Sequence, residues 1–438
     1  MQSVEFPLKL TTSSRKLIPL IKQKLREKVP LLTSNEIKRV KKPLHEALLD
    51  ELDEETFPQG HSFFDEIIQH DLKGSKLLTS NKELLERIFK DLKFCEKAFN
   101  IKKIQIYVKL ARHIQEVNEK LSWTIDKIFR CAVEFIQIHR LKDSSLDIIC
   151  KYFYGKFLNK SQKSYEDAVK NLSAAHNAMK LVKSVEEFKD IQFMLTDDLN
   201  SNLLKNFIKH ELFDALINFA DDIRQENPMK AIDLTGIALK LIEFDRKNFK
   251  MVFKYHMTMG KCFLILKTFE LAGNHFEDAF EVAIKQNFHV EAVESLIMLS
   301  EYYARLNDDE NYEKTLKKAK NLAKEFSLEK IESDICMTLG EFWSNKKNYQ
   351  KSVKYFNRSI EIFKKHDDLI NARKCQIMIA APLAALSFND IVNCIRKSTE
   401  ATPGNNRHLS HLILWYDRKY SVVNPYHDSY QDSPDDVE

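Results

Sequence analysis

Residues that could carry out catalysis or bind a metal are scattered along this chain. A helix of the His-Glu-x-x-His type, which places two zinc-binding histidines on one face, does not occur in it. Gly74-Ser75-Lys76 and Gly260-Lys261 lack the upstream glycine and the Ser or Thr after lysine that a phosphate-binding loop requires. His408 and His411 have helical spacing, but no Cys, Asp or Glu stands within four residues of them. The sequence therefore predicts no catalytic residue, no cofactor, no metal and no enzymatic activity.

Four pairs of adjacent aspartates outside the C-terminal acidic tail are the remaining candidates for acid–base chemistry. They are Asp197-Asp198, Asp221-Asp222, Asp308-Asp309 and Asp367-Asp368. All four pairs fall at predicted turns or helix ends, where an aspartate side chain accepts hydrogen bonds from the free backbone N–H groups of a helix. We therefore interpret them as helix caps.

The seven cysteines are odd in number, widely spaced, and include no Cys-x-x-Cys pair. This pattern is typical of reduced thiols, most of them in a core. The N-terminal residues form no apolar run of the kind found in signal peptides, and no stretch approaches the roughly 18 apolar residues of a membrane span. We expect a cytoplasmic chain without a membrane span.

The composition favours helices throughout. The 438 residues include only 8 Gly and 10 Pro, and no proline lies between Pro58 and Pro228 or between Pro228 and Pro382. Each of these two residue types makes up roughly 2% of the chain, against an average usage of about 7% and 5%. Long segments thus contain no residue that forbids a helix interior. The net charge of +4 is too small to indicate a nucleic-acid partner by bulk charge.

A repeat with a period of 40 residues is the most informative pattern in the chain. In the first clear copy, Gly260 is followed 3, 12, 16 and 19 positions later by Phe263, Ala272, Phe276 and Ala279. The same register returns further along the chain in a second and a third copy, with Ser300 in the second and with Gly340, Trp343 and Phe356 in the third. Weaker copies fall at Ala220 and at Ala380. These are the spacings of a tetratricopeptide repeat.

This register has a physical meaning for helix packing. Small residues let two helices cross closely and aromatic residues fill the remaining volume, so that each helix pair is stable only when stacked on its neighbours. Upstream, Gly155 with Ala168, Leu172 and Ala175 has the same pattern. The sequence predicts an all-α tetratricopeptide-repeat right-handed superhelix, an α-solenoid with repeats of about 40 residues, whose helices are longer than those of the common unit of about 34 residues.

The inner surface of such a superhelix is lined by two positions of each first helix, six residues before and one after the small residue. These positions hold Lys254, Lys261, Glu294, Glu301, Asp334, Glu341 and Lys374. We predict that they form a partner-binding groove with a basic end followed by acidic repeats, suited to a protein ligand of mixed charge. The alternative is that they are solvated faces without a ligand.

The ends of the chain differ in charge. Residues 9–42 hold eleven Lys or Arg and two acidic residues, whereas residues 46–55 are strongly acidic. We predict a basic, largely disordered arm over 1–60, a helical region with atypical repeat-like units over 61–200, a repeat array over 201–415 and an acidic disordered tail over 416–438. The arm could contact an acidic partner such as a microtubule.

Residues outside the generic repeat pattern carry a resemblance to a known family. They are the run from Leu110-Ala111 through Trp123, Cys131 and Ile136, the Ile379-Ala380 helix with Asn393 and Ile395, and the closing Leu412-Ile413-Leu414-Trp415 segment. On these residues the chain resembles the tetratricopeptide repeat protein 29 family over roughly residues 100–420. It differs from the usual consensus in having serine at 300, 352 and 359.

The resemblance implies a non-enzymatic scaffold of the ciliary or sperm-flagellar axoneme that is needed for motility. The implied partners are axonemal, dynein-associated or intraflagellar-transport proteins. The residues themselves indicate only a scaffold, and they leave open a cytosolic adaptor for cargo, motors or cell polarity. An enzyme built on helical repeats is the least favoured alternative, because no residues remain for a catalytic domain.

Overall fold

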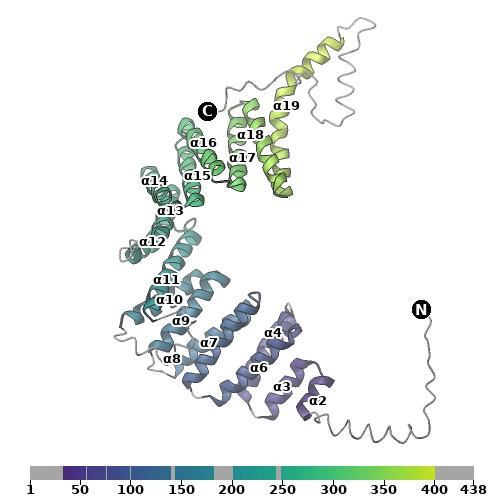
Figure 1. Ribbon diagram of the computed structural model, residues 1–438, viewed down its shortest axis with the longest axis vertical. Coiled ribbons are helices and arrows are strands. Elements are labelled where there is room, and N and C mark those ends of the chain that lie inside the picture. Colours follow the sequence, from purple (N-terminus) through teal and green to yellow (C-terminus); the bar gives the residue numbers. More distant parts are fainter. Residues whose placement is uncertain are drawn as a thin grey trace, which may run out of the picture. The chain divides into compact units, whose positions relative to one another are not determined.

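The structure is a computed structural model that describes residues 33–55, 57–74, 76–98, 100–139, 144–181, 201–242 and 248–399. These residues form eighteen α-helices and one π-helix, and no strand occurs among them. Helices adjacent in sequence also pack against each other, as α7 does with α8 and α13 with α14 (Figure 1). The predicted all-α repeat architecture is confirmed.

The chain divides into two compact units, residues 1–215 and 216–438. Their boundary lies inside a helix, α11 (Ser201–Ile223), whereas the sequence analysis placed the start of the array at residue 201. The first unit contains α2 (Ser34–Lys41), α3 (Leu44–Glu54), α4 (Pro58–Lys73), α5 (Leu77–Ser80), α6 (Lys82–Lys97), α7 (Asn100–Val117), α8 (Ser122–Ile138), α9 (Ser144–Phe157), η1 (Leu158–Gln162) and α10 (Tyr165–Leu181).

Close packing of a glycine is visible in the first unit where α9 meets α10. A Cβ atom added to Gly155 would lie 2.6 Å from Cγ of Leu172 and 3.3 Å from the carbonyl oxygen of Ala168. Leu172, Ala168 and Ala175 are all fully buried. The small residue thus lets α10 approach the backbone of α9, as the repeat-like pattern of this segment predicted.

The structure corrects the disordered arm that the sequence analysis predicted over residues 1–60. Residues 33–55 fold as α2 and α3, and Pro58 begins α4. Thr33 caps α2, accepting a hydrogen bond from the Glu36 N–H while its own N–H donates to the Glu36 carboxylate at 2.7 Å. The described structure therefore begins at residue 33, and residues 1–32 lie outside the described part of the chain.

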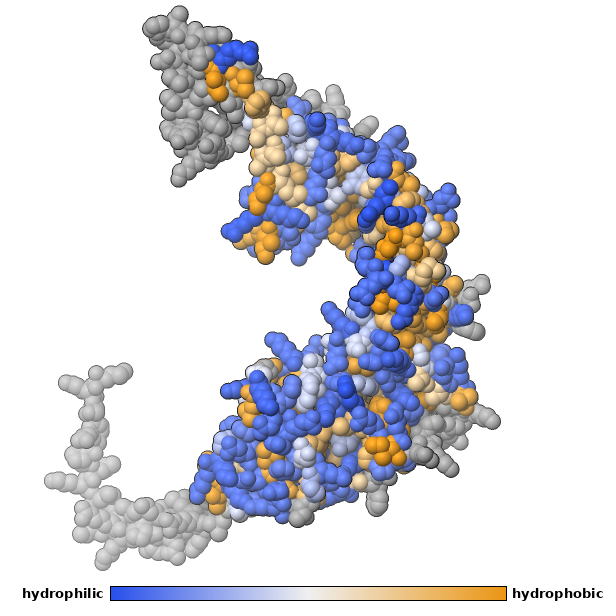
Figure 2. All heavy atoms as spheres, turned by 180° about the vertical axis from the view of Figure 1, so that it is seen from behind, coloured by the Kyte–Doolittle hydropathy of each residue, from blue (hydrophilic) through white to orange (hydrophobic). Residues whose placement is uncertain are grey.

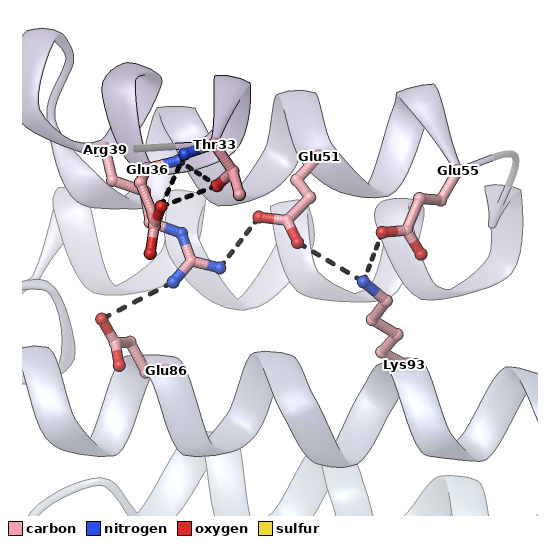
Figure 3. A network of polar contacts seen from close by, with 7 residues as sticks. All are labelled: Thr33, Glu36, Arg39, Glu51, Glu55, Glu86 and Lys93. Atoms are coloured by element: carbon pink, nitrogen blue, oxygen red, sulfur yellow. Dashed lines mark hydrogen bonds and ion pairs between the residues drawn. The ribbon is translucent and has the colours of Figure 1, made fainter. Parts of the chain in front are cut away.

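Ion pairs between the basic and acidic segments explain this correction (Figure 3). Arg39 donates to Glu51 of α3 at 2.9 Å and lies 3.9 Å from Glu86 of α6. Lys93 of α6 pairs with Glu51 at 3.4 Å and with Glu55. Basic residues at 38, 39 and 42 are thus paired with acidic residues of α3, and Glu51 is only 6% exposed.

The second unit is the regular part of the array. Its helices after α11 are α12 (Pro228–Ile242), α13 (Phe249–Ile265), α14 (Phe269–Lys285), α15 (His289–Arg305), α16 (Asp309–Glu325), α17 (Glu329–Asn345), α18 (Tyr349–Lys365) and α19 (Leu369–Thr399). Each of α13 to α18 has 17 residues. With three-residue turns, a hairpin of two such helices gives the 40-residue period.

The turns of this unit share one backbone geometry. At each turn one residue adopts a left-handed conformation with φ between 55° and 61°, and these residues are Lys267, Asn287, Asn307, Ser327, Lys347 and Asp367. The residue after it donates its N–H to the carbonyl five positions earlier, as Thr268 does to Phe263 at 3.0 Å. This is the hydrogen bond of a Schellman motif, which satisfies a free carbonyl at the helix end.

The repeat register corresponds to close contacts inside the hairpins. A Cβ atom on Gly260 would lie 2.6 Å from the Phe276 ring, and one on Gly340 would lie 2.8 Å from the Phe356 ring. Other residues in this register that are buried are Ala220, Ala272, Ala279 and Ser300. Trp343 is half-buried, with the Lys351 ammonium 4.2 Å from its ring centroid.

Serines replace the usual small residues without leaving their hydroxyls unpaired. Ser352 of α18 donates to the Gly340 carbonyl of α17 at 2.7 Å, and Ser359 of α18 donates to the Ser333 carbonyl at 2.9 Å. The Ser300 hydroxyl donates to the Ile297 carbonyl at 2.6 Å. Because buried hydroxyls with a partner cost little, the serines fit the same close helix crossings.

The structure differs from the predicted repeat at Ala380, which is exposed. A turn equivalent to that at Lys347 would fall at Ser387. Instead, α19 is one helix of 31 residues that runs through this point, with Pro382 in its interior. Within the described residues no helix folds back onto Ala380. Figure 2 shows apolar colour along α19, where Ile370 and Ile377 are 83% and 76% exposed.

Candidate partner-binding surface

The seven predicted groove residues lie on the first helix of each hairpin and on α19. None of them is buried: Lys254, Lys261, Glu301 and Glu341 are half-buried, and Glu294, Asp334 and Lys374 are exposed. Between them, Met257, Ile297 and Met337 turn inward against apolar clusters. The first helices therefore present a charged edge over an aliphatic layer.

Electrostatic effects show which of these residues lie close together. The pKa of Glu294 is raised by burial and by Glu291, while Lys261 lowers it. The pKa of Asp334 is raised by burial and by Asp368, while Lys374 lowers it. Charged residues of neighbouring first helices thus lie close enough to interact, as expected for stacked hairpins.

The acidic part of the surface centres on α15 and α17. Burial raises the pKa of the Tyr312 hydroxyl, and the charges of Glu341 and Glu301 raise it further. Both carboxylates therefore act on the same side chain of α16. With Asp334, they form a stretch of negative charge that favours a cationic group of a ligand.

An open pocket of about 750 Å³ lies at the basic end of the surface, where α13 and α15 end. It is lined by Arg224, Gln225, Lys261, Leu264, Ile265, Lys267, Phe269, Met298, Glu301 and Arg305. The lining combines four cations and one carboxylate with an apolar floor. Such a combination can hold an acidic group next to an aliphatic or aromatic one.

The cations of this pocket differ in how far they are neutralised. Arg224 pairs with Asp221, and Arg305 lies 3.4 Å from Glu301. Among the described residues, neither Lys261 nor Lys267 forms an ion pair. These two ammonium groups are the ones available to an anionic ligand.

Two predicted groove residues, Lys261 and Glu301, line the pocket, and three cations in it were not predicted. Arg224, Lys267 and Arg305 lie at the ends of first helices or in the turn that follows, whereas the sequence analysis considered only two positions of each helix. Basic residues in the last turn of a first helix were the signal that could have identified them.

The described cysteines do not form a reactive site. The six described thiols are free, and five of them are buried. Burial raises the pKa of Cys95 and Cys336 to about 12 and that of Cys262 to about 11, so these thiols stay protonated at neutral pH. They behave as core residues.

Two of the three aspartate pairs that the structure describes act as helix caps, whereas Asp221-Asp222 lies inside α11, where Asp221 pairs with Arg224. Asp308 accepts a hydrogen bond from the Asn311 N–H, and Asp368 accepts one from the Asn371 N–H, each at 3.1 Å. One polar cluster was not anticipated: His256 and His275 meet across the hairpin of α13 and α14, with Asp278 beside them. His408 and His411 lie outside the described residues.

Comparisons with known proteins give a limited result. No protein-family model and no curated protein matches the chain. Among solved structures, the apo form of RapI is 12% identical, with 65% of this chain and 99% of that chain covered and a TM-score of 0.39. Aspartyl phosphate phosphatase F from Bacillus subtilis is 12% identical, with 85% and 88% covered and a TM-score of 0.41.

A third similar structure is a signal transduction ATPase with numerous domains and a tetratricopeptide repeat sensor, from Pyrococcus horikoshii. It is 12% identical, with 89% of this chain and 64% of that chain covered and a TM-score of 0.39. None of the helices that the structure describes combines the length and the apolar character of a membrane span. On its own 40-residue hairpins, with their glycine–phenylalanine contacts, the chain has the all-α fold of a tetratricopeptide-repeat superhelix.

Proposed function

We propose that this chain is a non-enzymatic scaffold that binds an extended protein segment along the first helices of its second unit. The observation that carries the proposal is the pocket at the ends of α13 and α15, in which Lys261 and Lys267 are unpaired among the described residues and lie beside an apolar floor. Unpaired charges next to exposed apolar side chains are typical of a surface that a partner completes.

The charge order along the surface defines the ligand. An acidic side chain or terminal carboxylate would occupy the pocket between Lys261 and Lys267. Basic side chains further along the same segment would face Glu301, Glu341 and Asp334. The ligand is thus a peptide segment with an acidic end and a basic end, and its direction along the array is fixed by charge.

We place this scaffold in the axoneme of cilia or sperm flagella, where it would support motility. Support for this location comes from the resemblance of Leu110-Ala111, Trp123 and the Ile379-Ala380 helix to the tetratricopeptide repeat protein 29 family. The partners would be axonemal, dynein-associated or intraflagellar-transport proteins. A microtubule contact through residues 1–32 is part of the same proposal, because Lys38, Arg39 and Lys42 are already paired within the fold.

Charge reversal tests the binding surface. Two double variants reverse the charges, Lys261→Glu/Lys267→Glu and Glu301→Lys/Glu341→Lys. Each should bind at least about tenfold less partner protein from detergent-extracted flagella, since close charge pairs across an interface contribute strongly to binding. The matched control is Lys285→Glu/Lys314→Glu, which reverses two exposed lysines on the second helices. Equal retention by all three folded variants would show that partners bind elsewhere.

The location needs a separate experiment. The full chain is tagged in flagellated cells, the flagella are demembranated with detergent, and the axonemes are then extracted with high salt. An axonemal scaffold held partly by charge should stay after detergent and be released by salt. Loss into the detergent supernatant, or absence from flagella, would favour a cytosolic adaptor and leave the binding surface to be judged by the charge reversals.

A further inference from the structure

The hairpin of α13 and α14 brings two histidines and an aspartate together in the second unit. Nδ1 of His256 lies 3.0 Å from Nδ1 of His275, and 3.5 Å from Oδ2 of Asp278. One ligand atom from each of the three residues lies within 4.8 Å of the other two. Three atoms with lone pairs therefore converge on one point.

The equivalent positions of the other hairpins show that the fold does not require this cluster. Forty residues on, the histidines are replaced by Leu296 and Thr315, which are 2% and 9% exposed. The position of Asp278 is taken there by Lys318, and by Arg358 in the hairpin after that. The same helix crossing thus packs without a polar triad and with a positive charge in place of the carboxylate.

A hydrogen bond between the two Nδ1 atoms leaves the third ligand atom, Oδ2 of Asp278, without a donor among the three. Two neutral imidazoles that meet Nδ1 to Nδ1 can share only one proton, and the carboxylate of Asp278 adds another acceptor. Burial lowers the pKa of both histidines, which favours the neutral imidazole that binds a metal ion. A cation between the three atoms would satisfy all of them at once.

The surroundings hold the rings in place and leave one side open. The His275 ring stacks on Phe263 with centroids 5.5 Å apart, and His256 meets the Tyr255 ring edge-on at 5.1 Å. The His256 side chain is 18% exposed, whereas that of Asp278 is 55% exposed. Ligands fixed by packing on one side, with solvent on the other, give an ion both a preorganised site and a path of entry.

We propose that His256, His275 and Asp278 form a binding site for a divalent transition metal of the zinc class. Two imidazole nitrogens and one carboxylate oxygen are a ligand set that Zn²⁺ accepts, whereas Mg²⁺ and Ca²⁺ prefer oxygen ligands. Three protein ligands leave a fourth position for water or for a side chain of a partner. The ion would link α13 to α14 in the hairpin that carries Lys261 and Lys267.

Cobalt is the probe for this site, because Co²⁺ occupies zinc sites and absorbs visible light when its coordination is tetrahedral. The full chain, first treated with a chelator, is titrated with Co²⁺. We expect one equivalent to bind with a visible absorption that Zn²⁺ abolishes. His256→Gln, His275→Gln and Asp278→Asn should each weaken Co²⁺ binding at least tenfold.

The control is His366→Gln, which removes a surface histidine that lies 2.7 Å from a single carboxylate, Glu329. It should bind Co²⁺ as the unmodified chain does. Asp278→Asn keeps the test valid if a histidine variant misfolds, because this side chain is mostly exposed. No visible absorption from the unmodified chain with excess Co²⁺, or binding that Asp278→Asn leaves unchanged, would overturn the proposal.

Discussion

Two glycines of the second unit lie in helices but have opposite surroundings. A Cβ atom on Gly260 would lie 2.6, 2.8 and 2.9 Å from three atoms of the Phe276 ring, which is fully buried and cannot move aside. A Cβ atom on Gly236 in α12 would meet nothing within 4 Å. The same chemical change therefore has opposite consequences at the two sites.

We predict that Gly260→Ala lowers the free energy of unfolding by about 1 to 3 kcal/mol, since overpacking outweighs the better helix propensity of alanine. Gly236→Ala should raise it by about 0.5 to 1 kcal/mol, because glycine in an open helix interior is unfavourable. Urea unfolding of both variants gives the comparison. Equal effects at the two sites would contradict the packing of Gly260 against Phe276.

The pH dependence of stability should report on the paired histidines. Burial lowers the pKa of His256 and of His275, Asp278 opposes this shift at both, and the His275 charge adds to it at His256. The unfolded chain takes up protons near the ordinary value of about 6.5, and the folded chain only at lower pH. The stability from these neutral rings is thus complete above about pH 6.5 and is lost as pH falls through the folded values.

We expect His256→Leu/His275→Thr, which copies the residues of the next hairpin, to flatten this dependence. In the presence of a chelator, the free energy of unfolding of the unmodified chain should fall more steeply between pH 7 and pH 5 than that of the variant. Urea unfolding at several pH values measures both slopes. Parallel slopes would mean that the two rings titrate alike in the folded and the unfolded chain.

At the scale of elements, the turns of the second unit share one left-handed backbone conformation, although different residue types adopt it. The left-handed backbone costs an ordinary residue roughly 1 to 2 kcal/mol, whereas glycine adopts it freely and asparagine more easily than most. Lysine holds this position at 267 and 347, and asparagine holds it at 287 and 307. The turns are therefore fixed by the packing of 17-residue helices on each other, and strain remains at the lysines.

Glycine at these positions should be stabilising. Lys347→Gly should raise the free energy of unfolding by about 0.5 to 1 kcal/mol, after allowance for the greater freedom of glycine in the unfolded chain. Asn287→Gly should raise it by less, and Lys347→Ala should leave it nearly unchanged. Thermal unfolding compares the three. A larger gain for alanine than for glycine would show that φ at residue 347 is not positive.

The sequence could predict the elements that depend on local pattern and could not predict those that depend on distant contacts. The hairpins from α13 to α18 follow from the register of Gly260 and Gly340. Ala380 keeps that register, but the residues after it do not form a turn. The helices over residues 33–55 are stabilised in part by the ion pairs of Arg39 with Glu51 and Glu86, contacts that no local period contains.

The residues of the candidate sites also divide into those that a local sequence pattern predicts and those that only distant contacts bring together. The groove positions such as Lys261 and Glu301 repeat every 40 residues, so a single rule could place them on one surface. The pocket adds Lys267 and Arg305 at the ends of helices, where that rule does not apply. His256 and His275 are 19 residues apart and meet only because two helices fold back on each other, in one hairpin and not in the others.

At the scale of the whole array, each hairpin of the second unit contacts mainly the helices next to it. Helices α14 and α15 pack together, as do α16 and α17. In such an array, the free energy of unfolding is approximately the sum of the stability of each hairpin and the energy of each interface between neighbouring hairpins. A destabilising substitution therefore lowers mainly the stability of its own hairpin and of the hairpins next to it. The helices nearest to a destabilising substitution in the second unit should therefore unfold first, and the more distant helices later.

Hydrogen exchange can test this with two matched variants. Gly340→Ala should increase amide exchange most in α17 and α18 and least in α13 and α14. Gly260→Ala should give the reverse order. If both variants raised exchange equally over all six helices, the second unit would unfold as one block.

The constant spacing of the left-handed turn residues makes the second unit divisible. Asn287 and Ser327 have nearly the same φ, 55° and 56°, and enclose one complete hairpin, α15 with α16. Excising residues 288–327 would join α14 to α17 through an unchanged turn. Duplicating them would lengthen the array by one step. A chain of this kind can gain or lose binding positions by whole modules, which makes its length a variable that recombination can change while the turn geometry is kept.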